Sequence, residues 1–262
     1  KSSLVLESSL PILEKQFSPS KASKSNVLVV DQSPLSGTPR STPASYTKAL
    51  DPIRRLFAQM EQSKIKGFDM GRFSYNVARG RCSVCEGRAY ISVAMHFLSD
   101  VWEPCEACQG KRYNEETLSV YFKGKNIADV LALRIDEACE FFKDQPKILR
   151  LLTPLCEVGL SYLRLGQSVT TLSGGEAQRV KLAGELSKAS KTETVYLFDE
   201  PTTGLHLKDI QVLWNMFRRL SDNGHTVVIV EHHPDIIRLA DWKIELGPEG
   251  GNLGGFLIKE GI

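Results

Sequence analysis

The chain has 262 residues, of which 42% are hydrophobic and 24% charged, and its formal net charge is +2. This length suits one α/β domain with an inserted subdomain, and the composition is ordinary for a folded globular protein. A net charge so close to zero gives no argument for a nucleic-acid partner from bulk electrostatics. No stretch of sequence reaches the ~20 apolar residues of a membrane span and nothing at the start reads as a signal peptide, so we expect a cytoplasmic protein.

The first candidate functional residues stand at the start of the chain, which reads Lys1-Ser2-Ser3 before an apolar, helix-compatible run. In a Walker A loop a lysine reaches the β- and γ-phosphates of a nucleotide, and the hydroxyl after it binds Mg²⁺. Given the motifs further along, we expect Lys1, Ser2 and Ser3 to bind ATP as the end of a truncated loop, with Ser2 on Mg²⁺. A fragment without the preceding glycines is expected to be inactive alone. The alternative is that Lys1 is an ordinary exposed lysine.

A buried strand is predicted next, at residues 26–31, followed by a loop rich in serine, proline and glycine. Gln32 opens this loop. At the end of such a strand it is a candidate contact for Mg²⁺ and for an attacking water, and we count it among the catalytic residues. The alternative is a solvated loop glutamine, because only its position supports the assignment.

Two Cys-x2-Cys pairs form the second strong pattern. Cys82 and Cys85 are separated from Cys105 and Cys108 by 19 residues, a spacing typical of a four-cysteine zinc site. A glycine shortly after each pair permits a tight turn, and residues 89–97 between the pairs are predicted to form a strand. Disulfides or buried thiols are the alternatives, but structural disulfides are unusual in a cytosolic protein. We therefore predict one bound Zn²⁺, which leaves no place for His96 as a ligand.

Basic residues surround these cysteines. Locally, Glu86 alone opposes a group of arginines, and Lys111-Arg112-Tyr113 follow the second pair; the arginines are Arg72, Arg79, Arg81 and Arg88. Basic side chains next to an aromatic ring suit phosphate contacts with base stacking, so Arg88, Lys111 and Arg112 are predicted to bind DNA. The alternative is a solvated surface. Cys139 and Cys156 lie on helical patterns and are expected to be core thiols.

A glycine-rich helix start follows at Leu172-Ser173-Gly174-Gly175. A serine hydroxyl and two glycines at a helix N-terminus can form a phosphate-sized anion site, because backbone N–H groups and the helix dipole point at the ligand. Ser173, Gly174, Gly175 and Gln178 are therefore predicted to contact ATP.

An apolar strand at residues 195–198 ends in Asp199 and Glu200. One carboxylate can hold Mg²⁺ while the other polarises the attacking water, which is the Walker B arrangement. We assign Asp199 to magnesium and Glu200 to catalysis. Either this motif or the glycine-rich helix start could arise by chance, but both in this order indicate part of an ABC-type ATPase.

The remaining elements follow ABC order. Residues 207–220 have apolar positions at helical spacing, and residues 226–230 form a predicted buried strand. His232 follows this strand and is predicted to be the catalytic switch histidine, whereas His233 is expected to be a surface residue. Because ligands bind at the carboxyl ends of parallel strands, Gln32 and Asp199 should converge with His232 on one site.

The expected fold class is therefore α/β: an ABC-type ATPase (P-loop NTPase) domain with an inserted helical signature subdomain and a four-cysteine zinc module. Residues 1–66 and 191–262 would form the two parts of the ATP-binding core. Residues 67–190 would form the insertion, with the zinc module at about 80–113.

Along essentially its whole length the chain resembles the UvrA family of excinuclease proteins, in the C-terminal half that contains the second ABC-type nucleotide-binding domain. The runs that carry the resemblance include VDQSPLSGTPRSTPASYT, CEACQGKRYN, TLSGGEAQRVKLAGELSK, LFDEPTTGLH and VEHHPDIIRLADWKIELGPEGG. DQSP, CEAC-x-GKRYN and TTGLH are specific to that family. The chain departs from the family at Gly184, where a basic residue is usual, and at Asn252-Leu253, which interrupt a glycine run; we expect these departures to affect peripheral contacts.

The resemblance implies a DNA-damage-recognition ATPase of bacterial nucleotide excision repair, with ATP, Mg²⁺ and Zn²⁺ as cofactors. ATP would lie at composite interfaces between two ABC halves, and the zinc module would couple hydrolysis to DNA binding. The implied partners are double-stranded damaged DNA, UvrB through an upstream region, and a second copy of the full-length protein, with no membrane. Two alternatives remain open: a UvrA-like paralogue in drug self-resistance, and the nucleotide-binding subunit of an ABC transporter, against which the four cysteines argue.

Overall fold

The computed structural model describes residues 12, 26–31, 35, 38–93, 101–187, 193–203, 205, 207–248 and 254–262. The predictions for Lys1, Ser2, Ser3, Gln32 and His96 lie outside these residues. The chain falls into two compact units. The first comprises Lys1–Pro34, Ser173–Leu182 and Lys188–Ile262, and the second comprises Leu35–Leu172 and Ala183–Ser187.

This division differs from the expected one at both ends of the insertion. The second unit already begins at Leu35, so residues 35–66 belong with the cysteine pairs and not with the sheet. Conversely, Ser173–Leu182 belong to the first unit, together with the strand that carries Asp199.

A parallel sheet of three strands forms the centre of the first unit, in the order β1-β4-β5. Its strands are β1 (Asn26–Val30), β4 (Thr194–Asp199) and β5 (Thr226–Val230), and all three coincide closely with predicted strands. The central strand β4 is buried over its first five residues, as its apolar run requires. β1 and β5 are partly exposed, because each pairs with β4 alone in the described sheet.

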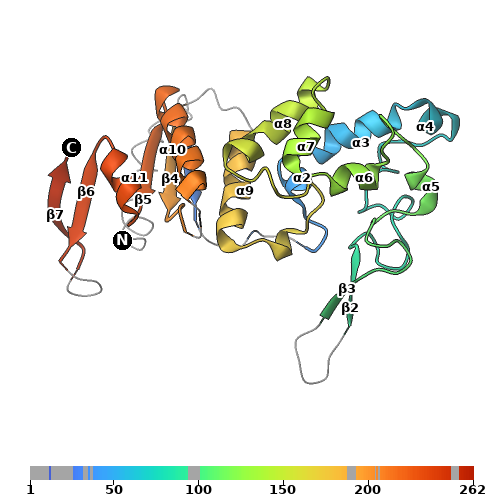
Figure 1. Cartoon of the computed structure of the whole chain (residues 1–262), viewed down its shortest axis with the longest axis horizontal. Helices are drawn as coiled ribbons and strands as arrows, with labels where there is room; N and C mark the ends of the chain where they lie inside the picture. The colour runs from blue at the N-terminus through green and yellow to red at the C-terminus, as the bar shows by residue number, and fades with distance from the viewer. Residues whose placement is uncertain are drawn as a thin grey trace. The chain divides into compact units, whose positions relative to one another are not determined.

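Helix α10 (Leu207–Asp222) packs its apolar face on this sheet, and Figure 1 shows it beside β4 and β5. Leu213 and Phe217 are buried, and the Phe217 ring lies 4.7 Å from that of Phe198 on β4. The predicted amphipathic helix is thus confirmed. The same unit contains the first part of α9 (Gly174–Leu186), α11 (Pro234–Leu239) and an antiparallel pair, β6 (Lys243–Gly247) with β7 (Phe256–Gly261).

The second unit is mainly helical. Its helices are α2 (Pro43–Tyr46), α3 (Leu50–Ala58), α4 (Glu61–Ile65), α5 (Glu115–Leu118), α6 (Ile127–Ala132), α7 (Ile135–Phe141) and α8 (Pro146–Glu157), with a 3-10 turn at Val169–Thr171. Thr42, Asn114 and Asn126 cap α2, α5 and α6 through their side chains, as short helices need. Large buried side chains such as Phe57 and Tyr75 fill its core.

A short hairpin leaves the cysteine-bearing loops of this unit (Figure 1). It pairs β2 (Tyr90–Val93) with β3 (Val101–Pro104), and all eight residues are exposed. The strand begins one residue later than predicted because Ala89 has φ +75°, which lies outside the β region.

Three smaller predictions concern the thiols of Cys139 and Cys156, the position of Gly184, and membrane-spanning helices. Cys139 and Cys156 lie on α7 and α8 as predicted, but they are half-buried, with their Sγ atoms 3.8 Å apart. Gly184 is buried, and a Cβ there would lie 3.0 Å from the Tyr46 ring, so this position is a packing contact and not a peripheral one. None of the helices in the described ranges has both the length and the apolar character that a membrane crossing needs.

Candidate metal centre and nucleotide site

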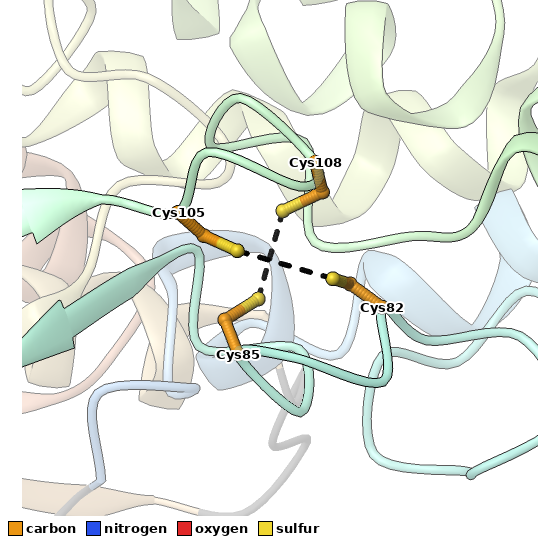
Figure 2. Close-up of side chains that lie close together, drawn as sticks. All are labelled: Cys82, Cys85, Cys105 and Cys108. Carbon is orange, nitrogen blue, oxygen red and sulfur yellow. Dashed lines mark hydrogen bonds between the residues drawn. The ribbon is translucent and has the colours of Figure 1, made fainter.

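The four predicted metal ligands lie together. Cys82, Cys85, Cys105 and Cys108 are all buried, and their sulfur atoms lie within 4.8 Å of one another (Figure 2). The Cys82–Cys105 and Cys85–Cys108 pairs have Sγ–Sγ distances of 4.0 and 3.6 Å. Four sulfurs at about 2.3 Å from one zinc ion would be about 3.8 Å apart at tetrahedral angles. The geometry of the cluster therefore fits a tetrahedral thiolate site.

The two cysteine loops have the same backbone conformation. After Cys85, residues Glu86, Gly87 and Ala89 have positive φ, and after Cys108 the corresponding residues Gln109, Gly110 and Arg112 do the same. The loops also close on each other: Cys105 N–H donates to Ala89 O, and Cys82 N–H donates to Arg112 O, both at 2.9 Å. Each cysteine loop thus donates one backbone hydrogen bond to the other loop, and the two bonds join equivalent positions.

The two loop glycines are required for different reasons. At Gly87 a Cβ would lie 2.1 Å from the carbonyl oxygen of Tyr75, so only glycine fits. At Gly110 nothing lies within 4 Å of an added Cβ, and the requirement is its φ of +76°. The first cysteine loop is therefore packed tightly onto the unit, whereas the second is limited mainly by its own backbone.

The thiols carry an electrostatic argument for a metal. All four are free cysteines, and burial raises the pKa of Cys85 and raises that of Cys108 to about 12. At Cys105 burial is outweighed by hydrogen bonds from Cys108 and Ala107, so the pKa of that thiol is lowered instead. At Cys85 and Cys108 burial therefore disfavours the thiolate unless a cation compensates its charge. A bound dication supplies that compensation, and a closed set of four sulfurs is the donor set that zinc prefers in structural sites.

The basic residues around the cluster are more neutralised than the sequence suggested. Glu86 is shared by Arg40, Arg81 and Arg88, at 3.4, 3.3 and 3.6 Å. The other two arginines have acidic partners outside the two cysteine loops: Arg72 pairs with Glu116, and Arg79 pairs with Asp69 at 2.8 Å. The view that Glu86 alone opposes this basic group was therefore wrong.

Arg112 requires a correction as a predicted DNA contact. Its residue is 4% exposed, and its guanidinium donates to the carbonyls of Gly87 and Gly166 at 3.0 and 3.1 Å. It also lies over the Tyr75 ring, 5.1 Å from the centroid. These contacts make Arg112 an internal brace, whereas its neighbour Lys111 and the half-exposed Arg88 remain on the surface.

The predicted nucleotide-site carboxylates lie at the carboxyl end of the sheet. Asp199 ends β4 opposite Val230 of β5, and Glu200 N–H donates to the Val230 carbonyl at 2.9 Å. Glu200 has φ +46°, a conformation that non-glycine residues adopt only where the surroundings impose it. The loop after β4 is therefore fixed against the end of β5.

His232 is brought next to Glu200, as the order of the motifs predicts. Its Nδ1 lies 4.0 Å from a Glu200 carboxylate oxygen and 3.8 Å from one of Glu231. The His232 side chain is 71% exposed and that of Glu200 40%, so both can be reached from solvent. His233 has a different environment: its side chain is 25% exposed and its Nδ1 is buried, so it is not the surface histidine that was expected.

Glu231 is a residue of this site to which the sequence analysis gave no role. Its side chain is 3% exposed, yet it lies directly between β5 and His232 in the chain. The signal in the sequence was an ionisable residue at the end of an apolar strand, directly before the candidate histidine. Such a residue must find several hydrogen-bond donors if it is buried.

The glycine-rich helix start has the expected form. Ser173 caps α9 reciprocally with Glu176: Ser173 N–H donates to the Glu176 carboxylate at 2.7 Å, and Glu176 N–H donates to the Ser173 hydroxyl at 3.3 Å. Ser173 and Gly174 are exposed. Gly175 approaches the loop after β4 so closely that a Cβ would lie 2.7 Å from the Thr203 carbonyl oxygen.

Gln178 also requires a correction. It is 2% exposed, and its amide nitrogen donates to the carbonyls of Val30 and Asp199 at 3.0 and 2.8 Å. These two hydrogen bonds therefore link α9 to the carboxyl ends of β1 and β4. This burial replaces the predicted contact with ATP by a structural role.

The parallel sheet with paired carboxylates at the end of β4, the glycine-rich start of α9 and the inserted helical unit define an ABC-type ATPase domain of the P-loop class. Within this class, the chain is homologous to part of UvrABC system protein A. It is 57% identical over 235 residues to that protein from Vibrio cholerae and 56% identical to that from Staphylococcus aureus strain COL. Each match covers 90% of this chain and 25% of the relative, so the chain spans about a quarter of these proteins.

The comparison of structures agrees. UvrA2 from Deinococcus radiodurans matches with a TM-score of 0.87 and 50% identity, over 90% of this chain and 29% of that one. No family model matches the chain.

Proposed function

We propose that the chain is the part of a UvrA-type DNA-repair ATPase that joins ATP hydrolysis to a zinc-bearing DNA element. The observation that carries the proposal is the presence, in one chain, of the Glu200–His232 pair and a buried four-cysteine cluster. The identity of 57% to UvrABC system protein A supports this reading. The comparisons favour neither a resistance paralogue nor a transporter component.

At the nucleotide site, Glu200 would polarise the attacking water and His232 would contact the γ-phosphate. Asp199 would hold Mg²⁺, which neutralises phosphate charge, with Ser2 and Gln32 as further proposed ligands. Lys1, Ser2 and Ser3 would hold the phosphates. The exposed Ser173-Gly174 start of α9 would face ATP bound to the other ABC half. Because the chain spans a quarter of its relatives, we expect hydrolysis only in the longer protein.

At the cysteine cluster, the four thiolates would hold one structural Zn²⁺. The ion would fix the two cysteine loops and thereby the base of the β2–β3 hairpin. Lys111 and Arg88, which lie on the surface of the same module, remain the proposed phosphate contacts with damaged double-stranded DNA. UvrB binding would involve regions outside this chain, and the full-length protein would act as a homodimer in the cytoplasm.

The test compares DNA binding by the full natural protein that contains these residues. We expect tighter binding to a duplex with one bulky lesion than to the same duplex undamaged, and a change in this ratio when ATP replaces ADP. Equal affinity for both duplexes in every nucleotide state would overturn the repair function. The same protein should hydrolyse ATP, and a protein that binds lesions without hydrolysis would overturn the ATPase assignment.

A further inference from the structure

A buried carboxylate, that of Glu231, lies between the loops that carry Glu200 and His232. Glu231 has a side-chain exposure of 3%, although most glutamates lie in water. A buried carboxylate is destabilising unless hydrogen bonds replace the lost solvent. The identity and position of its donors therefore show what this side chain does.

The two carboxylate oxygens bind two different loops. Oε1 accepts from the backbone N–H of Thr202 at 3.1 Å and from the Thr202 hydroxyl. Oε2 accepts from the N–H groups of His232 and His233 at 2.7 and 2.9 Å. Thr202 belongs to the loop after β4 and the histidines to the loop after β5, so one side chain clamps both loops together.

The ionised form suits this position. Burial alone would raise the pKa of Glu231, but the hydrogen bonds from Thr202 and from the N–H groups of His233 and His232 hold it below its usual value. A carboxylate can accept at both oxygens, whereas an amide of the same shape presents an NH₂ group to one pair of donors. Glutamine at this position would therefore repel one of the two loops.

The clamped loops carry the proposed reacting groups. Glu200 stands two residues before Thr202 in the first loop, and His232 is itself a donor to the clamp in the second. The Glu200 carboxylate and His232 Nδ1 are 4.0 Å apart, although both side chains are exposed enough to move. The Glu200 N–H bond to the Val230 carbonyl ties the first loop to the end of β5, and Glu231 adds a second tie, between Thr202 in that loop and the N–H groups of the histidine loop.

We propose that Glu231 is a positioning residue for ATP hydrolysis, holding the loops of Glu200 and His232 at a fixed separation through Thr202. The inference rests on the proposed ATPase function. Glu231 is buried and its oxygens are taken up by donors from the two loops, so it acts on the reaction through the geometry of those loops.

The test measures ATP turnover in the full natural protein with its other ATP site inactivated. Glu231→Gln should lower kcat by on the order of 10²-fold, because a displacement of about 1 Å at reacting groups has that effect. KM and nucleotide affinity should change less than about threefold, since the proposed phosphate contacts are untouched. Thr202→Val should lower kcat less, and Thr202→Ser, which keeps the hydroxyl, should recover most of that loss. Glu245→Gln, the same change at an exposed carboxylate of β6, is the matched control.

Two further measurements separate the outcomes. In a double-mutant cycle, Glu231→Gln with Thr202→Val should be strongly non-additive, because both changes break one contact. A purely structural role would lower Tm but leave kcat per folded molecule unchanged, and that result would overturn the inference. Glu200→Gln serves as the reference: if it leaves turnover intact, the proposed catalytic role of Glu200 fails and the positioning role falls with it, whereas loss in Glu200→Gln with normal turnover in Glu231→Gln defeats only the positioning role.

Discussion

The cysteine cluster and the carboxylate loops are built in opposite ways. At the cluster the candidate ligands are themselves buried, and two short runs with the same backbone conformation bring them together. At the ends of β4 and β5 the candidate reacting groups Glu200 and His232 are exposed, and a buried neighbour, Glu231, holds their loops. The proposed metal centre therefore depends on the candidate ligands themselves, whereas the proposed nucleotide site depends equally on a residue, Glu231, that would not touch the nucleotide.

The largest expected effect tests the exposed candidate catalytic residue, Glu200. Glu200→Gln in the full natural protein, with the other ATP site inactivated, should slow turnover by about 10²- to 10⁴-fold, because the amide cannot act as the base. Nucleotide affinity should be retained. Steady-state hydrolysis and equilibrium nucleotide binding measure the two quantities, and an unchanged rate would move the catalytic role to another carboxylate.

The next largest effect tests the buried cysteine cluster. Cys105→Ala removes one ligand of the cluster and should weaken zinc binding by more than the ~10- to 100-fold that loss of a supporting hydrogen bond causes. Metal analysis after dialysis should find one zinc per wild-type chain and almost none in the variant. Cys139→Ala is the control, because that half-buried thiol lies outside the cluster and its loss should leave the metal content unchanged. A wild-type protein without zinc would contradict the site.

Lys111 and Arg112 are adjacent in the second cysteine loop, but Lys111 is exposed and Arg112 is buried. Arg112→Ala should lower the free energy of unfolding by about 2–3 kcal/mol, because the buried carbonyl of Gly87 and the part-buried carbonyl of Gly166 lose a charged donor. Lys111→Ala should leave Tm nearly unchanged, weaken DNA binding a few-fold and reduce the salt slope by about 1. Thermal melts and DNA titrations at several salt concentrations measure both. Equal effects of the two changes on stability would contradict the assignment of a brace and a surface residue.

The smallest effect concerns pH. The pKa of Glu231 is lower in the folded protein than its ordinary value of 4.5, so its contribution to stability is present above that value and is lost as pH falls through the folded pKa. The wild type should be more stable than Glu231→Gln at pH 7, by about 2 kcal/mol, and this difference should shrink on acidification below pH 4.5. Melting curves of both proteins across this range test the sign; a difference that grows in acid would show that the carboxylate is not the stabilising form.

Most of the correct predictions of strands, helices and the cysteine cluster came from patterns within short stretches of sequence. The strand at Thr226–Val230 follows from five β-branched residues between a turn and a charge, and the cysteine cluster follows from spacing. The positive φ of Ala89 was not predictable, because alanine shows no preference for it.

Contacts between distant residues account for the remaining errors. Gln178 reaches Val30, 148 positions away, and Arg112 reaches Gly166, 54 positions away. A polar residue that is buried by such partners has the same local sequence as one that faces solvent. For this reason the sequence placed Gln178 and Arg112 in contact with ligands, while the fold uses them as internal ties.

The missing side chain at Gly175 has a consequence for how the start of α9 and the loop after β4 can move. Because the Thr203 carbonyl oxygen lies only 2.7 Å from where a Cβ of residue 175 would be, the start of α9 and the loop after β4 are in close backbone contact. Van der Waals repulsion at this contact opposes closer approach of the two segments but does not oppose their separation. Movement of the loop toward α9 would displace the helix start, whereas movement away would leave it behind. Under the proposed function, a change beside Glu200 that moves its loop toward α9 would therefore be passed to the exposed helix start at Ser173 and Gly174.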